Sequence, residues 1–200
     1  IEIMGDKIKA KELVSSLGIP IVPGYSGDIQ SNEQIRSIVK EIGYPVIVKA
    51  TSGGGGKGMR IVNSEDELWD SIVSAQNEAK LAFGDGKVFI EKYLNKPRHI
   101  EIQVFGDGKG KAVHLYSRDC SLQRKYQKIL EEAPALNISK EKLDEIQNIC
   151  VKACEEISYK GAGTLEFLYE NGQFFFIEMN TRIQVEHTVT EMITGIDLVQ

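Results

Sequence analysis

A glycine-rich segment between two apolar stretches is the first part of this sequence whose residue types suggest chemistry. Val46–Ala50 is apolar apart from Lys49, residues 53–56 are consecutive glycines, and Lys57 follows them. Glycine lets the backbone approach an anion and point its N–H groups at it, and lysine supplies positive charge for phosphate oxygens. The segment therefore predicts a loop that binds phosphate.

This loop differs from the two common nucleotide-binding fingerprints. A Walker A loop requires Ser or Thr directly after its lysine, and here Gly58 follows Lys57. A Rossmann fingerprint requires a helix after the glycines, whereas residues 59–62 have the pattern of a returning strand. A flexible linker is the alternative, but apolar strands directly on both sides of the glycines argue against it.

Three oxygen ligands near the carboxyl end of the chain are candidates for a magnesium site. Glu166 lies on one expected strand, and Glu178 and Asn180 lie on the next. Carboxylate and amide oxygens are what Mg²⁺ takes from proteins, usually few of them, with phosphates and water completing the coordination. Solvated strand carboxylates are the alternative for either glutamate taken alone.

The register of the last hairpin decides whether the two glutamates meet. A two-residue turn at 171–172 places them on opposite faces, because side chains alternate along a strand. A three-residue loop over 170–172, or a bulge with the same effect, places them on one face as neighbours. Phe174 and Phe176 have the same parity as Glu178, so we expect that face to be covered.

The polar segment 180–187 contains groups that could bind a small anion and remove a proton from it. Arg182 and Gln184 could hold a planar oxyanion, and Glu186 beside them could act as a base. A structural ion pair between Arg182 and Glu186 is the alternative. The short basic run 124–128 is expected at a solvated strand or loop edge.

The elements expected around these groups mix helices with antiparallel strands. Capping residues and apolar spacing predict helices over about 6–18, 31–43, 64–83 and 139–157. Alternation and turn residues predict strands over 45–50, 59–62, 88–93, 98–105, 111–117, 163–170 and 173–179. Because helices do not alternate strictly with strands, the pattern predicts an α+β architecture, an antiparallel sheet with flanking helices. Residues 21–93 have their own helices and hairpin, so we expect a lid-like subdomain within one domain spanning 1–200.

Composition excludes several classes of protein. The chain has 24 Lys and Arg against 29 Asp and Glu, a net charge of −5, which argues against nucleic acid or an anionic membrane as partner. No apolar stretch approaches the ~18 residues of a membrane span. Three cysteines without a signal-peptide pattern favour a reducing, cytoplasmic location. The first residue is Ile1, and no Gly, Asn or Pro stop signal follows the last apolar residues of 190–200, so we expect a piece of a longer chain.

Taken together, the motifs resemble the ATP-grasp superfamily and, within it, biotin carboxylase. The matching stretches run in order along the whole chain: 4–7, 52–58, 91–94, 97–101, 118–128, 131–134, 161–164 and 176–187. The resemblance implies an ATP-grasp fold with a small glycine-loop lid. It also implies an ATP-dependent ligase that activates bicarbonate with Mg-ATP to carboxyphosphate and carboxylates biotin. Acetyl-CoA carboxylase of fatty acid biosynthesis is the first expectation for the parent enzyme.

The resemblance also implies residue roles by position. The contacts it assigns to ATP are Lys7, Lys49, Gly54, Gly55, Gly56, Glu91, Lys92, Leu94, His99 and Gln123. The ligands it assigns to Mg²⁺, with Mn²⁺ as a substitute, are Glu166, Glu178 and Asn180. Those it assigns to bicarbonate are Lys128, Arg182, Gln184 and Val185, and Glu186 is the implied general base, so that Lys128, Arg182 and Glu186 form the catalytic set. Tyr126 is a departure, because many members carry His at that position.

The partners implied are bicarbonate, biotin on a biotin carboxyl carrier protein, a carboxyltransferase component and a second copy in a homodimer of the full-length chain. The family carries further domains on both sides of this region, so we expect these 200 residues to bind Mg-ATP and to carboxylate biotin poorly. Two other functions stay open: a bicarbonate-activating domain like that of carbamoyl phosphate synthetase, and a nucleotide-binding module without catalysis.

Overall fold

The structure is a computed structural model that describes residues 7–29, 31–52, 59–125 and 127–200. The predicted phosphate-binding glycines at 54–56 and Tyr126 lie outside the described residues, as does the side chain of Lys7. The chain divides into two compact units, one of Ile1–Ile21 with Lys96–Gln200 and one of Val22–Asn95. The lid role expected for residues 21–93 stays a prediction.

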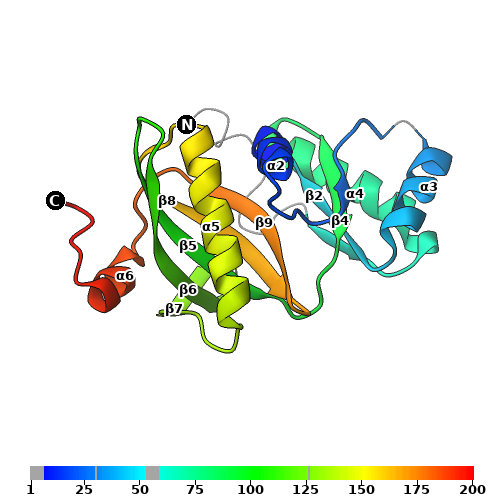
Figure 1. Cartoon of the computed structure of the whole chain (residues 1–200). Coiled ribbons are helices and arrows are strands. Elements are labelled where there is room, and N and C mark those ends of the chain that lie inside the picture. The colour runs from blue at the N-terminus through cyan, green and yellow to red at the C-terminus, as the bar shows by residue number, and fades with distance from the viewer. Residues whose placement is uncertain (1–6, 30, 53–58, 126) are drawn as a thin grey trace. The chain divides into compact units, whose positions relative to one another are not determined.

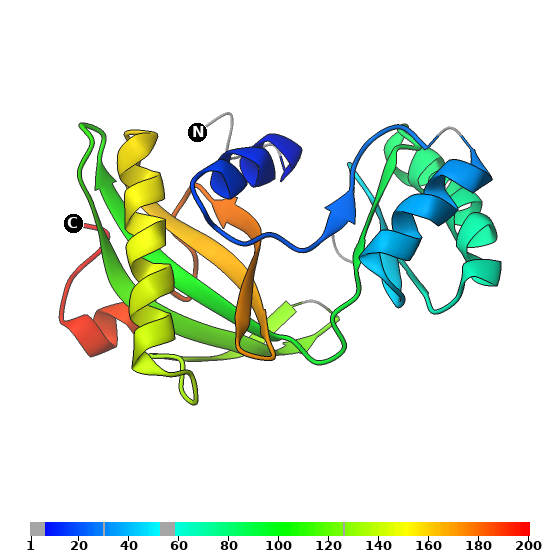
Figure 2. The ribbon, with the colours of Figure 1, turned by 45° about the vertical axis from the view of Figure 1, so that its right-hand side comes forward.

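The larger unit is built on a five-stranded antiparallel sheet in the order β7-β6-β5-β8-β9. Its strands are β5 (Arg98–Asp107), β6 (Ala112–Arg124), β7 (Gln127–Glu132), β8 (Lys160–Glu170) and β9 (Gln173–Asn180). Helix α5 (Lys140–Glu156) crosses one face of the sheet in both views (Figure 1, Figure 2). Helix α2 (Lys7–Ser16) packs near β9, and α6 (His187–Thr194) follows the last strand.

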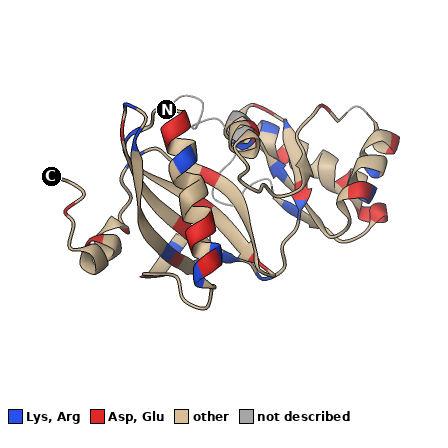
Figure 3. Ribbon diagram, in the orientation of Figure 1, with Lys and Arg blue, Asp and Glu red and all other residues tan. Residues whose placement is uncertain are grey.

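Local sequence accounts for α5. The hydroxyl of Ser139 accepts the backbone N–H of Lys142, which satisfies one of the free donors at the start of the helix. Ile146, Cys150 and Cys154 form a buried stripe, one helical turn apart, that packs in the main core. The other side of the helix carries charges of both signs (Figure 3). Burial of the apolar stripe therefore fixes which side of α5 faces the sheet.

Strand β5 has one apolar and one polar face, and both are buried. The apolar residues in the core with α5 are Ile100, Ile102 and Val104. His99, Glu101 and Gln103 alternate with them and lie on the opposite face, where Glu101 and Gln103 are 0% exposed. Buried polar groups are costly unless they have partners, so this face must contain a polar network.

In the hairpin between β8 and β9, a β-bulge and not the length of the loop brings Glu166 and Glu178 to the same face. Asn171 and Gly172 form a two-residue turn with φ of 51° and 78°, the left-handed conformation that such hairpins favour. The alternative of a three-residue loop is therefore wrong. A β-bulge next to Glu166 then shifts the pairing, so that Glu166 lies directly opposite Glu178.

Because of the same bulge, Glu178 lies in surroundings that differ from those expected from the sequence. Phe174 and Phe176 are buried in the core, and beyond the bulge Met179 continues their face. Glu178 therefore lies on the opposite, polar face of the sheet, and the expectation that it shares a face with the two phenylalanines is wrong. The extra residue in the bulge changes the parity of every side chain after it.

Strand β6 extends well beyond its predicted limit, and β7 forms where no separate strand was predicted. β6 continues to Arg124 instead of ending near residue 117, because it pairs with β7, where only a strand or loop edge was expected. The polar residues of this ribbon give no apolar alternation from which to predict a strand. The pairing places Lys128 of β7 opposite Gln123 of β6.

The smaller unit has a four-stranded antiparallel sheet in the order β1-β4-β2-β3. Its elements are β1 (Gly24–Tyr25), α3 (Asn32–Ile42), β2 (Val46–Ala50), β3 (Arg60–Val62), α4 (Glu65–Phe83) and β4 (Val88–Lys92). Ser31 caps α3 as predicted by accepting the Gln34 backbone N–H. At α4 the Ser64/Glu67 capping box does not form: Ser64 makes no side-chain cap bond, and Glu67 accepts the backbone N–H of Asn63.

Candidate active site

Four charged residues from four neighbouring strands lie opposite one another across the polar face of the larger sheet. Arg118 of β6 is opposite Glu101 of β5, Glu101 is opposite Glu166 of β8, and Glu166 is opposite Glu178 of β9. The Cβ atoms of directly opposite residues are roughly 5 Å apart, and like charges in such pairs are destabilising. Three carboxylates on consecutive strands therefore require cations beside them.

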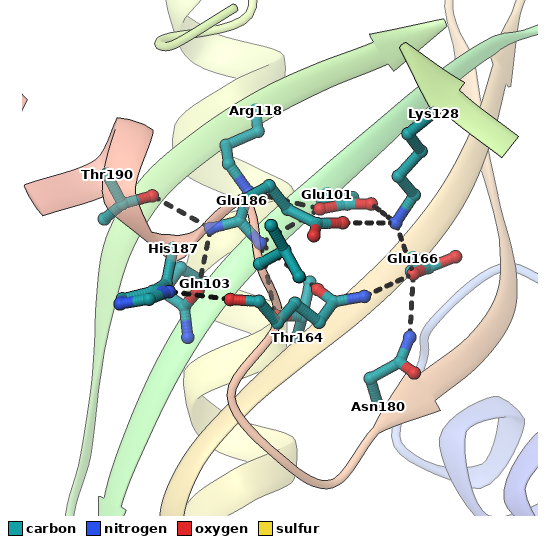
Figure 4. Close-up of polar contacts among 12 residues, drawn as sticks. Glu101, Gln103, Arg118, Lys128, Thr164, Glu166, Asn180, Glu186, His187 and Thr190 are labelled. Carbon is teal, nitrogen blue, oxygen red and sulfur yellow. Dashed lines mark hydrogen bonds and ion pairs between the residues drawn. The ribbon is translucent and has the colours of Figure 1, made fainter. Parts of the chain in front are cut away.

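Lys128 supplies one of these cations from β7. Its ammonium forms ion pairs with Glu101, with Glu166 at 3.0 Å and with Glu186 at 2.6 Å (Figure 4). Burial would lower the pKa of Lys128, but the carboxylates of Glu101 and Glu166 raise it above its ordinary value. The ammonium is therefore charged at neutral pH and joins carboxylates from three segments of the chain.

His99 supplies a second cation. Its Nε2 atom lies 3.0 Å from a carboxylate oxygen of Glu166 and 3.3 Å from one of Glu101. Burial would lower the pKa of His99, but the two carboxylates outweigh it and raise the pKa to about 9. The imidazole is therefore protonated at neutral pH.

The same contacts keep the glutamates ionised despite their burial. Desolvation would raise the pKa of Glu101, but His99, Arg118 and Lys128 lower it to about 2. The pKa of Glu166 is also lowered, because His99 and Lys128 outweigh its desolvation. The site is thus a set of fixed charges at neutral pH, not a set of neutral acids.

Two amide side chains complete the surroundings of Glu166. Asn180 donates from Nδ2 to Glu166 at 2.7 Å, and Gln184 donates from Nε2 to the same oxygen at 2.9 Å. Gln184 is 6% exposed and Glu186 is 8% exposed, so the loop that carries them is held against the sheet. The arrangement can present a carboxylate base, Glu186, next to a fixed ammonium and amide donors.

Arg118 lies beneath this cluster with a completely buried side chain. The groups that accept hydrogen bonds from its guanidinium are those of Glu101, Gln103, Thr164, Gln184 and Thr190 (Figure 4). Sequence reasoning named neither Arg118 nor Glu101 as a site residue. The signal that could have found Glu101 is the polar alternation along β5, which resembles a solvated face until its burial is known.

The structure brings some of the predicted bicarbonate residues together and leaves others apart. Lys128, Gln184 and Glu186 belong to the cluster, as described above. Arg182 is exposed and donates to the backbone carbonyl of Ile183 at 3.1 Å, and Val185 is 89% exposed. The alternative ion pair between Arg182 and Glu186 does not form among the described residues, since Glu186 pairs with Lys128 instead.

The predicted nucleotide residues of the smaller unit have protein partners. The ammonium of Lys49 lies 2.7 Å from Glu91, whose side chain is 6% exposed. Lys92 donates to two backbone carbonyls, those of Gly43 at 3.0 Å and Tyr44 at 2.8 Å. Leu94 is half-buried.

A predicted nucleotide residue of the larger unit, Gln123, also has a protein partner: it donates to the carbonyl of Cys120 at 2.9 Å. The nucleotide contacts of these residues stay predictions.

The donor set at the β8–β9 end of the row fits a hard divalent cation. Glu166 and Glu178 face each other and Asn180 lies on the same face, which gives the oxygen ligands that Mg²⁺ prefers. Among the described residues the cluster has four carboxylates, those of Glu101, Glu166, Glu178 and Glu186. It has three basic groups, those of His99, Arg118 and Lys128. The excess of acidic groups favours a further cation.

Comparison with known proteins places this site in a family. A family model described as the carbamoyl-phosphate synthase L chain, ATP binding domain, matches residues 6–200. The chain belongs to this family. Within it, the chain is 56% identical to a biotin carboxylase of Haemophilus influenzae, over 100% of this chain and 45% of that protein. It is 48% identical to a pyruvate carboxylase of Bacillus subtilis, over 100% of this chain and 17% of that protein. It thus spans less than half the length of these relatives.

Solved structures agree with this membership and show the fold. The biotin carboxylase domain dimer of Hydrogenobacter thermophilus 2-oxoglutarate carboxylase, in complex with MgADP, ADP and bicarbonate, superimposes with a TM-score of 0.89 at 51% identity, covering 99% of this chain and 44% of that one. A biotin carboxylase of Campylobacter jejuni in complex with a β-γ-ATP ligand gives 0.90 at 48% identity, covering 99% and 45%. The α+β ATP-grasp fold expected from the sequence is confirmed. In the part of the chain that the structure describes, no helix is long and apolar enough to cross a membrane.

Proposed function

We propose that this chain is the ATP-binding part of a biotin carboxylase, which uses Mg-ATP and bicarbonate to form carboxyphosphate and then carboxylates biotin. The observation that carries the proposal is the carboxylate row Glu101, Glu166 and Glu178 with Lys128 and Glu186 converging on it. Similarity to biotin carboxylases over the whole chain supports it.

The first step of the proposed reaction is proton transfer from bicarbonate. Glu186 takes the proton, and Lys128, 2.6 Å from it, offsets the charge of the dianion that forms. A bicarbonate oxygen then attacks the γ-phosphorus of ATP, the bond to the bridging oxygen breaks, and ADP leaves with carboxyphosphate as the product. Glu166, Glu178 and Asn180 would hold Mg²⁺, which when bound offsets negative charge on the phosphate oxygens.

The second step transfers the carboxyl group to biotin. Carboxyphosphate breaks down into CO₂ and phosphate, the phosphate takes the proton of the ureido nitrogen, and that nitrogen attacks CO₂. His99 and Glu101 keep their charges throughout at neutral pH, because the pKa of His99 is raised to about 9 and the pKa of Glu101 is lowered to about 2. We propose Lys49 of the smaller unit as a phosphate contact and residues 21–93 as the lid that excludes water.

The partners and the parent enzyme are proposals of the same kind. We propose a biotin carboxyl carrier protein, a carboxyltransferase component, a homodimer and a cytoplasmic location. For the parent enzyme we propose acetyl-CoA carboxylase, because relatives at 53–56% identity are named biotin carboxylase alone and the pyruvate carboxylase relatives are 48–52% identical. Carboxyl transfer to acetyl-CoA, assayed against pyruvate and 3-methylcrotonyl-CoA with the intact protein, tests that choice.

Binding is the first test of the proposal. We expect ATP to bind this chain in calorimetric titrations with Mg²⁺, and to bind weakly without it. Glu178→Gln should reduce the Mg²⁺ dependence, because it removes the charge of the carboxylate opposite Glu166. Lys49→Ala should weaken ATP binding both with and without Mg²⁺. Glu145→Gln, on the charged side of α5, is the matched control for a lost carboxylate. ATP binding that is indifferent to Mg²⁺ would contradict the metal site.

Turnover separates the proposal from the two other functions. In the intact protein, free biotin should stimulate bicarbonate-dependent ADP formation, whereas a carbamoyl phosphate synthetase-like domain, which the description of the family model favours, should not respond to biotin. Glu186→Gln should lower this rate by about 10²–10⁴-fold, the usual contribution of a general base. Glu191→Gln on the same helix is its control. A rate unaltered in Glu186→Gln would favour a module without catalysis.

A further inference from the structure

Arg118 is the only guanidinium among the described residues that is 0% exposed, and every N–H group it has is engaged. Nε and Nη2 donate to Glu101 at 3.2 and 2.9 Å. Nη1 donates to Gln103 at 2.7 Å and to Thr190 at 2.9 Å. Nη2 also reaches Thr164 and Gln184, each at 3.3 Å. With its donors used by protein groups, Arg118 has none left for a substrate.

The contact with Gln184 determines which way that amide points. Because Oε1 of Gln184 accepts from Arg118, its Nε2 faces Glu166, to which it donates at 2.9 Å. The reversed amide would place N–H groups against the guanidinium and its carbonyl oxygen against the carboxylate, and both contacts would be repulsive. Arg118 therefore keeps the donating end of Gln184 on the side of Lys128 and Glu166.

The contact with Thr190 holds the helix that follows the base. Thr190 is 1% exposed and lies one turn into α6, and Glu186 is the residue at the N-terminal cap of that helix. The hydrogen bond from Arg118 to the Thr190 hydroxyl thus ties α6 to strand β6. It holds the start of the helix at the position where the Glu186 carboxylate reaches Lys128.

We propose that Arg118 is a positioning residue for the anionic substrate: it orients Gln184 and anchors the start of α6, so that the donor of one and the carboxylate of the other meet bicarbonate together. The inference rests on the proposed function, since it assigns the residue that prepares the bicarbonate side of that site. It predicts a selective effect on bicarbonate, because Arg118 contacts none of the proposed nucleotide residues among those described.

The test is Arg118→Lys in the intact protein, which keeps a positive charge opposite Glu101 and loses the planar set of donors. The KM for bicarbonate should rise about tenfold or more, the effect of losing hydrogen bonds to a charged group, while the KM for ATP stays within about twofold. Arg98→Lys is the matched control. Arg98 forms a partly buried ion pair with Asp119 at 2.6 Å on the same sheet. Among the described residues its guanidinium donates only to Asp119 and to the carbonyl of Leu136, so the KM of Arg98→Lys for bicarbonate should not change.

A double-mutant cycle distinguishes positioning from a general loss of structure. If Arg118 acts in part through Gln184, the combination of Arg118→Lys with Gln184→Ala should raise the KM for bicarbonate by less than the product of the two single effects. Independent effects that multiply would overturn the proposal. If Arg118→Lys does not fold, Thr190→Val removes only the tie to α6, and a KM for bicarbonate unchanged in that variant would overturn it instead.

Direct binding separates this inference from the proposed function. Titration of ¹³C-labelled bicarbonate into the intact protein, followed by the NMR linewidth, should show binding by the wild type and weaker binding by Arg118→Lys. Binding that is equal in both would overturn the positioning role alone. No binding by the wild type in the presence of Mg-ADP would overturn the proposed function and, with it, this inference.

Discussion

Replacing Lys128 by methionine would leave three carboxylates facing one another without their shared cation. The ammonium pairs with Glu101, Glu166 and Glu186, and its side chain is 20% exposed. Removing one partner of a buried ion pair costs about 3–5 kcal/mol, and partial access of water favours the lower end, about 3 kcal/mol. For a chain of this size that corresponds to a melting temperature lower by about 6–12 °C.

The loss should depend on pH in a stated direction. In the wild type the pKa of Glu101 is lowered from 4.5 to about 2, so its contribution to stability is present above pH 4.5 and disappears as pH falls toward 2. Lys128 is one of the causes of that lowering, so Lys128→Met raises the pKa and reduces the contribution at neutral pH. The difference in unfolding free energy between the two proteins is therefore largest near pH 7 and shrinks below pH 4.5.

Urea unfolding at pH 7 and at pH 3.5 measures both quantities. Lys140→Met is the matched control, because Lys140 is 85% exposed and pairs only with Asp144, at 3.1 Å, among the described residues. An exposed pair one turn apart on a helix contributes about 0.3–0.5 kcal/mol. A loss in Lys128→Met that is no larger than in Lys140→Met, or that is equal at both pH values, would refute the reasoning.

Two further predictions concern other parts of the larger sheet. The folded pKa of His99, about 9, lies above its ordinary value of 6.5, so its contribution to stability is complete below pH 6.5 and is lost as pH rises through 9. His99→Asn should flatten this decline in urea unfolding at pH 6, 8 and 9.5, and an unchanged slope would contradict the assignment. Gly106→Ala should destabilise the fold by about 2 kcal/mol or more, because a Cβ there would collide with the backbone carbonyl of Tyr159. Gly163→Ala should cost less in the same assay, since the neighbours of its Cβ are side-chain atoms that can shift. Equal losses would show that the backbone at Gly106 yields as easily.

Local patterns in the sequence were sufficient for most elements and for the fold class. Ser31 and Ser139 cap helices because a side-chain oxygen within three residues of a free backbone N–H needs no distant partner. The alternation along β5 likewise reflects only the geometry of an extended chain. The ordered motifs added the ATP-grasp resemblance, from which the roles of Lys128, Gln184 and Glu186 were implied.

The tertiary structure alone decided how the charged groups meet. The bulge beside Glu166 sets the face on which Glu178 lies, and a one-residue change of register cannot be read from residue types when two turn geometries suit the same Asn-Gly pair. Arg118 is 72 residues from Thr190 in sequence, yet they share a hydrogen bond. Such contacts depend on strand order and register over the whole sheet, which local propensity does not encode. The sequence thus determined which groups are present, and the sheet determined which of them share a buried face.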